Sequence, residues 1–185
     1  MALTKTPVCD FGKKAKNFKL KSINNKVITL NDIKGEKATL IMFICNHCPY
    51  VKAIIKDLAK DCNELRNDGI SSVAIMSNDT KNYPEDSFDN MMKFAESNNF
   101  RNINYLFDET QEIAKKYGAV CTPDFFGYNR NLELQYRGRF RELKDLKPIN
   151  NGDSDLKIAM KMVAQTQKGP DEQIPSMGCN IKWFN

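Results

Sequence analysis

The sequence predicts an α/β fold in which a central mixed β-sheet is flanked by helices. Two runs, "TLIMFI" at 39–44 and "ISSVAIM" at 70–76, are largely apolar and contain β-branched residues, as is typical of strands buried on both faces of a sheet. Each run is followed by a segment whose apolar residues recur with the period of a helix. A strand–helix–strand–helix order of this kind indicates an α/β domain.

The whole chain, residues 1–185, is predicted to form one domain. At 185 residues it is long enough to bury a core without disulfides, and no repeat, low-complexity tract or linker divides it. Hydrophobic residues make up 41% of the chain and aromatic residues 10%, which indicates a globular protein. No apolar stretch approaches the roughly 18 residues that a membrane span needs, so no membrane association is expected.

Neither nucleic-acid binding nor export is predicted from the charge and the first residues of the chain. The net charge is +5, but the 28 Lys and Arg residues are spread among 23 acidic residues, as on an ordinary solvated surface. The first residues, "MALTKTPVCDFGKK", contain no apolar segment followed by a small-residue cleavage site. We therefore expect a cytoplasmic protein.

The run at 39–44 is expected to lie at the centre of the sheet and to lead into a long helix. The apolar residues of this helix share one face: Val51, Ile54, Ile55, Leu58, Ala59, Cys62 and Leu65. The segment "NDG" at 67–69 is expected to end it. The strand at 70–76 follows.

Alternating elements are predicted for the rest of the chain. The apolar stripes of three further helices are Phe88, Met91, Met92 and Ala95; then Ile113, Ala114 and Tyr117, closed by Gly118; and Leu156, Ala159, Met160 and Val163 in a helix over about 154–167. Strands are predicted at 103–107 and on both sides of a turn at 129–131. A loop at 144–155 should end at a helix N-cap, Asp153 or Ser154, and the tail from 175 should be irregular.

The segment "CNHCPY" at 45–50 is the main candidate for chemistry. Cys45 is expected at the junction of strand and helix, where free N–H groups and the helix dipole stabilise a thiolate, so it is the candidate nucleophile. Cys48 lies about one helical turn further on and can resolve a mixed disulfide with Cys45. Pro49 fits the first helical turn.

His47 is the single histidine of the chain and lies between the two cysteines. As an imidazolium it would favour the Cys45 thiolate and so raise the reduction potential of the pair. Only one CxxC pair is present among six cysteines, and in a reducing compartment this spacing indicates redox or metal chemistry rather than a structural disulfide framework.

The segments "FICNHCPYVK" and "CTPDFFGYNRNLELQYRGRF" resemble the thioredoxin-like superfamily, and in detail its peroxiredoxin-like branch of the alkyl hydroperoxide reductase C and thiol-specific antioxidant (AhpC/TSA) type. The segment "KNFKLKSINNKVITLNDIKGEKATLIMFI" is similar to the β-hairpin extension and lead-in strand that open this branch. "PSMGCNIKW" looks like the C-terminal ending of one peroxiredoxin-like subgroup. The resemblance covers nearly the whole chain and implies a thioredoxin-like fold.

The resemblance also implies a cis peptide bond between Thr122 and Pro123, facing the redox pair. Backbone groups of Thr122 would then lie beside Cys45 and pair with an extended segment of a substrate by strand addition. Asp124 and Phe125 would shape the same site.

One departure from the family pattern concerns peroxide. Peroxiredoxins carry a Pro-x-x-x-Thr-x-x-Cys motif whose threonine hydroxyl positions the peroxide, whereas the matching positions before Cys45 are Ala38 and Met42. Since a thioether cannot donate a hydrogen bond, dithiol–disulfide exchange is favoured over peroxide reduction.

The remaining cysteines divide into two groups. Cys62 lies on an apolar helix face and is predicted to be a core residue, and Cys9 is predicted to be incidental. Cys121 precedes the proline loop and Cys179 lies in the tail, so either an auxiliary redox role or a packing role is open for each.

Three functions remain open on the sequence. The leading hypothesis is an oxidoreductase that acts on protein or small-molecule disulfides, is reduced by a thioredoxin or glutathione system, and needs no cofactor. The second is a thiol peroxidase that acts on hydroperoxides through a sulfenic acid on Cys45. The third is a copper or zinc module with Cys45, His47 and Cys48 as ligands, for which a fourth ligand is missing nearby.

Overall fold

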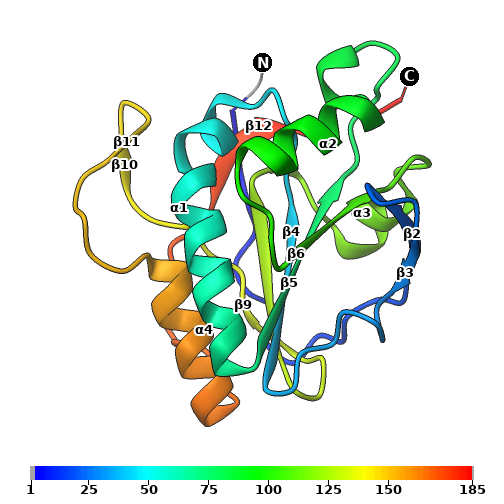
Figure 1. The fold of residues 1–185 in the computed structure, drawn as a ribbon. Helices are drawn as coiled ribbons and strands as arrows, with labels where there is room; N and C mark the ends of the chain where they lie inside the picture. The colour runs from blue at the N-terminus through cyan, green and yellow to red at the C-terminus, as the bar shows by residue number, and fades with distance from the viewer. Residues whose placement is uncertain (1–2, 185) are drawn as a thin grey trace.

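The structure is a computed structural model that describes residues 3–184. Its main sheet has seven strands in the order β3-β2-β6-β5-β4-β8-β9 (Figure 1). In chain order these strands are β2 (Lys19–Ser22), β3 (Val27–Thr29), β4 (Ala38–Phe43), β5 (Ile70–Met76), β6 (Ile103–Phe107), β8 (Asp124–Asn129) and β9 (Leu134–Tyr136).

Helices cover both faces of this sheet (Figure 1). They are α1 (Pro49–Leu65), α2 (Phe88–Ser97), α3 (Glu112–Tyr117) and α4 (Asp155–Thr166), with the 3-10 turns η1 (Arg66–Asp68) and η2 (Pro84–Asp86). Within residues 3–184, no helix has both the length and the apolar composition that crossing a membrane requires.

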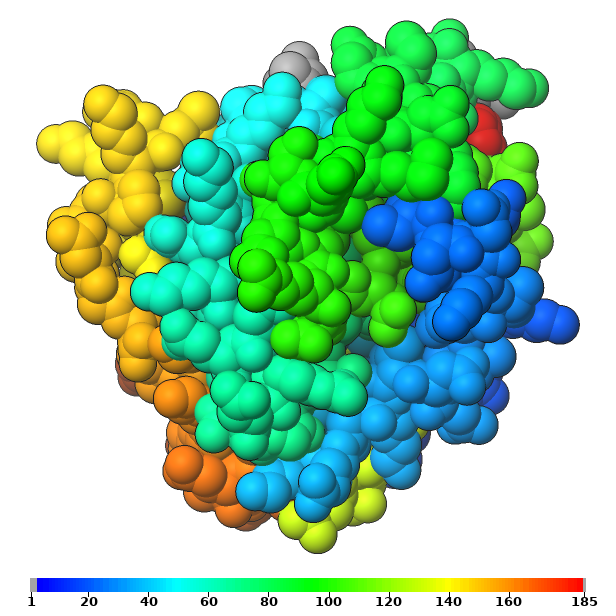
Figure 2. All heavy atoms as spheres, viewed as in Figure 1, coloured from blue at the N-terminus to red at the C-terminus, as the bar shows by residue number. Residues whose placement is uncertain are grey.

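Two smaller sheets complete the fold. β1 (Leu3–Lys5), β12 (Met177–Asn180) and β7 (Cys121–Thr122) form a three-stranded antiparallel sheet in the order β1-β12-β7. β10 (Leu143–Lys144) and β11 (Lys147–Pro148) form a short hairpin. The segment with this hairpin projects at the edge of the molecule, beside the first turns of α1 (Figures 1 and 2).

The strand β4 lies inside the sheet and separates two apolar cores. It pairs in parallel with β5 and antiparallel with β8, and all six of its residues are buried. Alternate side chains enter opposite layers: Leu40 and Met42 pack in the cluster that contains the apolar faces of α1 and α4, whereas Ile41 and Phe43 pack with those of α3. The prediction of a doubly buried strand is therefore confirmed.

The predicted helices are also present, with small differences. Gly69 follows η1 in the left-handed conformation with a φ of 77°, and Ser154 is the N-cap of α4, where its hydroxyl accepts a hydrogen bond from the Lys157 amide at 3.0 Å. The prediction that Met92 belongs to the apolar stripe of α2 is wrong, because Met92 is 38% exposed, whereas Met91 and Ala95 are buried.

The N-terminal hairpin expected from the resemblance is formed by β2 and β3. The tail, in contrast, is not wholly irregular, because residues 177–180 form β12 between two other strands. The predicted loop at 144–155 likewise begins in the β10–β11 hairpin. The strands of both missed elements are short: β12 forms through pairing with the distant strands β1 and β7, whereas β10 and β11 pair with each other.

Candidate active site

The segment with the two cysteines connects β4 to α1. The helix begins at Pro49, and Cys48 is its N-cap residue. The expectation that Cys45 lies at the helix N-terminus is therefore wrong, because Cys45 precedes the helix by a short bend. Pro49 has no backbone N–H group, and in the first turn of a helix this group would have no intrahelical acceptor. Proline therefore fits the position at which the helix starts.

Both sulfurs of the pair are buried against Thr122. The Cys45 residue is 1% exposed and Cys48 is not exposed at all. The Cys45 sulfur lies 3.4 Å from the Thr122 hydroxyl oxygen, and the Cys48 thiol donates a hydrogen bond to the Thr122 carbonyl oxygen at 3.1 Å. Cys45, Cys48 and Thr122, which the sequence predicted as site residues, are thus brought together in space.

The peptide bond between Thr122 and Pro123 is cis, as the resemblance implied. The edge of Thr122 that faces β12 is not open to a substrate strand, however, because β7 is paired there with β12, with Thr122 opposite Cys179. On that edge, the chain's own strand β12 takes the place of an added substrate strand.

Asp124 and Phe125 lie behind the proline loop. Asp124 is fully buried and forms an ion pair with Arg137 at 3.0 Å, and Phe125 is buried in the core. The pKa of Asp124 is raised by burial, which the nearby Arg137 guanidinium opposes. These two residues support the loop from inside rather than shaping an open site.

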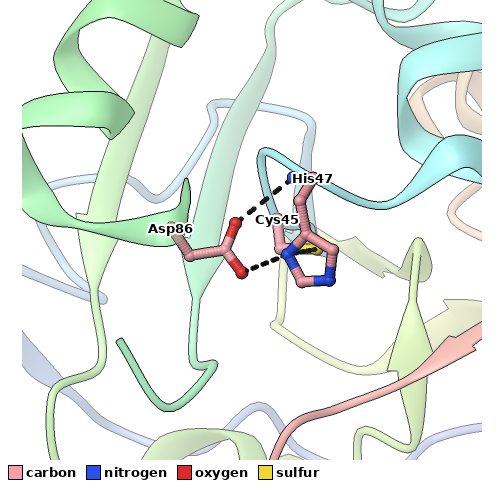
Figure 3. A group of neighbouring side chains, drawn as sticks. All are labelled: Cys45, His47 and Asp86. Atoms are coloured by element: carbon pink, nitrogen blue, oxygen red, sulfur yellow. Dashed lines mark hydrogen bonds and ion pairs between the residues drawn. The ribbon is translucent and has the colours of Figure 1, made fainter. Parts of the chain in front are cut away.

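His47 is held by Asp86, a residue that the sequence did not single out (Figure 3). The Nδ1 atom of His47 lies 2.7 Å from one carboxylate oxygen of Asp86. The other oxygen accepts the backbone N–H groups of Asn46 at 2.8 Å and His47 at 3.3 Å. Asp86 belongs to the 3-10 turn η2, about forty positions away from His47, and no spacing pattern in the sequence links the two.

Further contacts fix this pair from both sides. The Asn78 side chain donates a hydrogen bond to Asp86 at 2.8 Å, and the His47 ring stacks on Tyr83 with ring centroids 5.5 Å apart. Tyr105 donates a hydrogen bond to the Asn46 side chain at 2.9 Å. The imidazole therefore has a defined position beside the sulfurs.

The hydrogen bond with Asp86 raises the pKa of His47 above its ordinary value, although partial burial opposes the shift. Burial alone would raise the pKa of Asp86, but the hydrogen bonds from His47 and Asn78 lower it below its ordinary value. Both shifts favour an imidazolium paired with a carboxylate.

The two thiols differ in acidity. The hydrogen bond with Cys45 lowers the pKa of Cys48 to about 5, in spite of burial. The same interaction, together with burial and the charge of Asp86, raises the pKa of Cys45 well above its ordinary value. The hydrogen bond between the two thiols therefore favours the thiolate on Cys48 and the proton on Cys45, whereas the sequence predicted the thiolate on Cys45.

The cysteine, histidine and aspartate do not form a proton relay. Nδ1 of His47 faces both Asp86 and the Cys45 sulfur, which is 3.9 Å away. A relay would need one ring nitrogen for each partner. His47 can therefore act on the sulfurs through its charge.

The same three residues are the candidate metal ligands in the described part of the chain. One ligand atom each from Cys45, His47 and Asp86 lie within 4.8 Å of one another. This set replaces the Cys45, His47 and Cys48 set that the sequence offered, with a carboxylate in place of the second thiolate. Its sulfur, nitrogen and oxygen donors match those that zinc accepts.

The other cysteines occupy different environments. Cys62 is buried on the apolar face of α1, where burial raises its pKa to about 12, and its predicted core position is confirmed. Cys121 is also buried, and burial raises its pKa. Cys9 is partly exposed, with a pKa raised by burial to about 11. Cys179 lies in β12, opposite Thr122.

Met42 is buried in the interior strand β4, so the position that matches the family threonine supplies no hydroxyl. The hydroxyl nearest Cys45 among its contacts is that of Thr122, from a different strand.

A pocket of about 500 Å³ is lined in part by Pro123. Tyr50 and Ile54 of α1 form one wall, the β10–β11 hairpin forms another, and residues 174–177 form a third. The volume is in the range of small-molecule sites. Pro123 is the residue that this pocket shares with the site described above.

Comparison with known proteins identifies the family and the fold. The model of the AhpC/TSA family matches residues 11–140. Crystal structures of an uncharacterized conserved protein from Geobacillus kaustophilus and a hypothetical protein from Sinorhizobium meliloti are 40% and 36% identical, with TM-scores of 0.94 and 0.90. The first match covers 100% of this chain and 97% of that chain, and the second covers 98% of both.

A more distant match is the thioredoxin domain of a thiol-disulfide oxidoreductase from Bacteroides vulgatus. It is 17% identical, with a TM-score of 0.58, and the match covers 69% of this chain and 86% of that chain. This likeness concerns the fold, and it confirms the predicted thioredoxin-like architecture. No curated protein matches the sequence.

Proposed function

Because the chain belongs to the AhpC/TSA family and has a thioredoxin-like fold, we propose that it is a thiol–disulfide oxidoreductase in which Cys45 and Cys48 cycle between a dithiol and a disulfide. The observation that carries this proposal is the contact of both sulfurs with Thr122, directly before the cis-proline. Two thiols that share one hydrogen bond and differ in pKa can exchange a proton and then a disulfide bond.

In the proposed reaction Cys45 attacks one sulfur of a substrate disulfide, while its proton passes to the Cys48 thiolate along their hydrogen bond. The substrate S–S bond breaks, one half leaves as a thiolate, and the other half stays bonded to Cys45. Cys48 then gives its proton to the departed thiolate and attacks the Cys45 sulfur. This step forms the Cys45–Cys48 disulfide and releases the second half of the substrate as a thiolate.

The choice of Cys45 for the first attack rests on its surroundings. Cys45 lies beside the partly exposed His47 ring, whereas Cys48 is enclosed by Cys45, Thr122 and Cys179. The substrate gains two electrons, so an external thiol, such as a thioredoxin or glutathione system supplies, must reduce the pair again. The pocket next to Pro123 is the proposed approach for that thiol and for the substrate.

Trapping of the mixed disulfide tests the proposal. In a Cys48→Ser variant the first step remains and the second is blocked, so incubation with oxidised glutathione should accumulate protein with glutathione bonded to Cys45. In the matched variant Cys45→Ser, the more enclosed Cys48 should react with oxidised glutathione much more slowly than Cys45 does in Cys48→Ser, and no stable glutathione adduct on Cys48 should accumulate. Failure to find the adduct in Cys48→Ser, with the fold intact by circular dichroism, contradicts the proposed role of Cys45.

A second candidate function is a thiol peroxidase, and the Thr122 hydroxyl favours it. This hydroxyl lies 3.4 Å from the Cys45 sulfur. It could position a peroxide, which is the role of the family's motif threonine, whose matching position in this chain is Met42. Peroxide would convert the Cys45 thiolate to a sulfenic acid and release water or alcohol. Condensation with Cys48 would then form the disulfide and release water.

Replacement of Thr122 by Val separates the two candidates. If the peroxidase operates, Thr122→Val should slow the oxidation of Cys45 by peroxide about fivefold, the equivalent of about 1 kcal/mol for one hydrogen bond, while Thr122→Ser should keep the rate. Stopped-flow measurement of reduced protein with hydrogen peroxide provides the readout. Equal peroxide rates for wild type, Val and Ser variants would leave the hydroxyl without a role in peroxide chemistry.

A further inference from the structure

The strand β12 brings a third cysteine to the redox pair. In the antiparallel pairing of β12 with β7, Cys179 lies directly opposite Thr122. Side chains of directly opposed residues project from the same face of a sheet. The Thr122 side chain contacts the Cys45 sulfur, so the Cys179 side chain lies on the face that carries the pair.

Cys48 lies next to this third cysteine. The Cys48 thiol donates to the carbonyl oxygen of Thr122, the residue opposite Cys179, and Cys45, Cys48 and Cys179 are all buried in the apolar core that also contains the inner face of α1. Burial and the interaction with Cys48 raise the pKa of Cys179 to about 11. Cys48 therefore has two possible disulfide partners, Cys45 and Cys179.

The position of β12 is built into the fold. A Cβ atom at residue 178 would overlap the Thr122 carbonyl oxygen, so the close approach of the two strands requires Gly178. The other edge of β12 pairs with β1, where Cys179 lies opposite Leu3. The strand thus fills one edge of β7, and Cys179 is the residue opposite Thr122.

We propose that Cys179 is a third redox cysteine, which exchanges with the Cys45–Cys48 disulfide to form a Cys48–Cys179 disulfide. This inference rests on the proposed function, because it requires that the pair becomes oxidised. In this exchange, Cys179 of β12 reacts with the oxidised pair as the thiol of a substrate would.

The exchange step is balanced without an external reactant. The Cys179 thiol loses its proton and its sulfur attacks the Cys48 sulfur. The Cys45–Cys48 bond breaks, and Cys45 leaves as a thiolate that takes up the proton. The protein keeps one disulfide, so its oxidation state is unchanged, and Cys45 is a free thiol again.

A Cys45→Ser variant tests this inference independently of Cys45. Reduced protein is incubated with oxidised glutathione, free thiols are alkylated, and disulfide-linked peptides are identified by mass. We expect glutathione to bond to Cys48 or Cys179 and the remaining cysteine to displace it, so that the Cys48–Cys179 link accumulates. In the double variant with Cys179→Ser as well, the link should be lost, while Cys62→Ala in the Cys45→Ser background should keep it.

Absence of the Cys48–Cys179 link in folded Cys45→Ser protein, under conditions that oxidise wild-type protein fully, would overturn the inference. Wild-type protein gives a second measurement, because its oxidised form should contain both the Cys45–Cys48 and the Cys48–Cys179 links. If wild-type protein forms the first link and never the second, the inference is wrong while the proposed function stands. If wild-type protein never forms the first link, the proposed function itself fails.

Discussion

The charge next to the redox pair is set by two residues, His47 and Asp86. The carboxylate accepts hydrogen bonds from the imidazole, from Asn78 and from two backbone amides, which together keep it ionised in a buried place. The hydrogen bond with Cys48 and burial raise the pKa of Cys45, and the negative charge of Asp86 adds to this shift. The ion pair therefore favours a charged His47 and a protonated Cys45.

Replacement of Asp86 by Asn should lower the pKa of His47, because the opposite charge is lost. His47 is the single histidine of the sequence, so its imidazole signals in NMR titrations are unambiguous. An unchanged pKa in Asp86→Asn, with the fold retained, would contradict the assigned ion pair.

The same pair makes stability depend on pH. The folded-state pKa of His47 is raised, so its contribution to the free energy of unfolding is fully present below about pH 6.5 and is lost as the pH rises through the raised pKa. Urea unfolding of wild type across this range should show the decrease, and Asp86→Asn should not.

At the scale of elements, the close approach of β12 to β7 places Cys179 opposite Thr122 at the redox pair. Gly178→Ala should force the strands apart, because the new methyl group meets the rigid carbonyl of Thr122 rather than a flexible side chain. We expect a loss of about 1–3 kcal/mol in the free energy of unfolding, the usual cost of overpacking, measured by urea denaturation.

Gly152→Ala is the matched control for this substitution. A methyl group there would lie in ordinary contact with the Asn150 side chain, and the glycine has no positive φ. Equal stability of the two variants would show that the close approach at Gly178 is not needed.

The elements also explain which parts of the fold could be predicted from the sequence. β4, β5 and α1 are recognisable because their own residues carry the pattern: continuous apolar runs in the strands and a helical apolar face in α1. β12 has only four residues, one of them Gly, and no alternation that would mark a strand. It forms because β1 and β7 pair with it, which is a non-local cause.

The site divides in the same way. Cys45, His47 and Cys48 are adjacent in sequence and could be identified from it, and Thr122 and Pro123 followed from the family resemblance. Asp86 could not be found, because a single acidic residue in a polar turn carries no local signal until folding places it beside His47. The helix start was available in principle, since Pro49 marks the first helical position.

At the scale of the whole molecule, the projecting hairpin and the proline loop line one pocket, and the redox pair contacts Thr122, the residue before Pro123. The hairpin residues Leu143, Asp145 and Leu146 line the pocket together with Tyr50 and Pro123. The buried cysteines are not lining residues of this pocket. Under the proposed function, a substrate held in this pocket would have to reach the pair past Pro123, the pocket residue adjacent to Thr122.

Replacement of residues 144–147 by Gly-Gly should remove one wall of the pocket and leave the sheet intact. We expect kcat/KM for a small disulfide to fall about tenfold, the equivalent of about 1.4 kcal/mol, with the redox equilibrium of the pair unchanged. Asn25→Gly in the β2–β3 turn, where the φ of Asn25 is 63°, is the control and should keep full activity. An unchanged kcat/KM in the shortened variant would exclude the pocket as the approach.

The most direct test of the central claim is the oxidation of the Cys45–Cys48 pair. Fully reduced protein, free of oxygen, is exposed to one equivalent of oxidised glutathione or of hydrogen peroxide, and the disulfide is followed by alkylation and peptide mass. The oxidoreductase predicts efficient, reversible formation of the intramolecular disulfide with glutathione disulfide, and a peroxide reaction no faster than that of a free thiol. A peroxide reaction that is orders of magnitude faster, or a pair that stays reduced in glutathione disulfide, would contradict it.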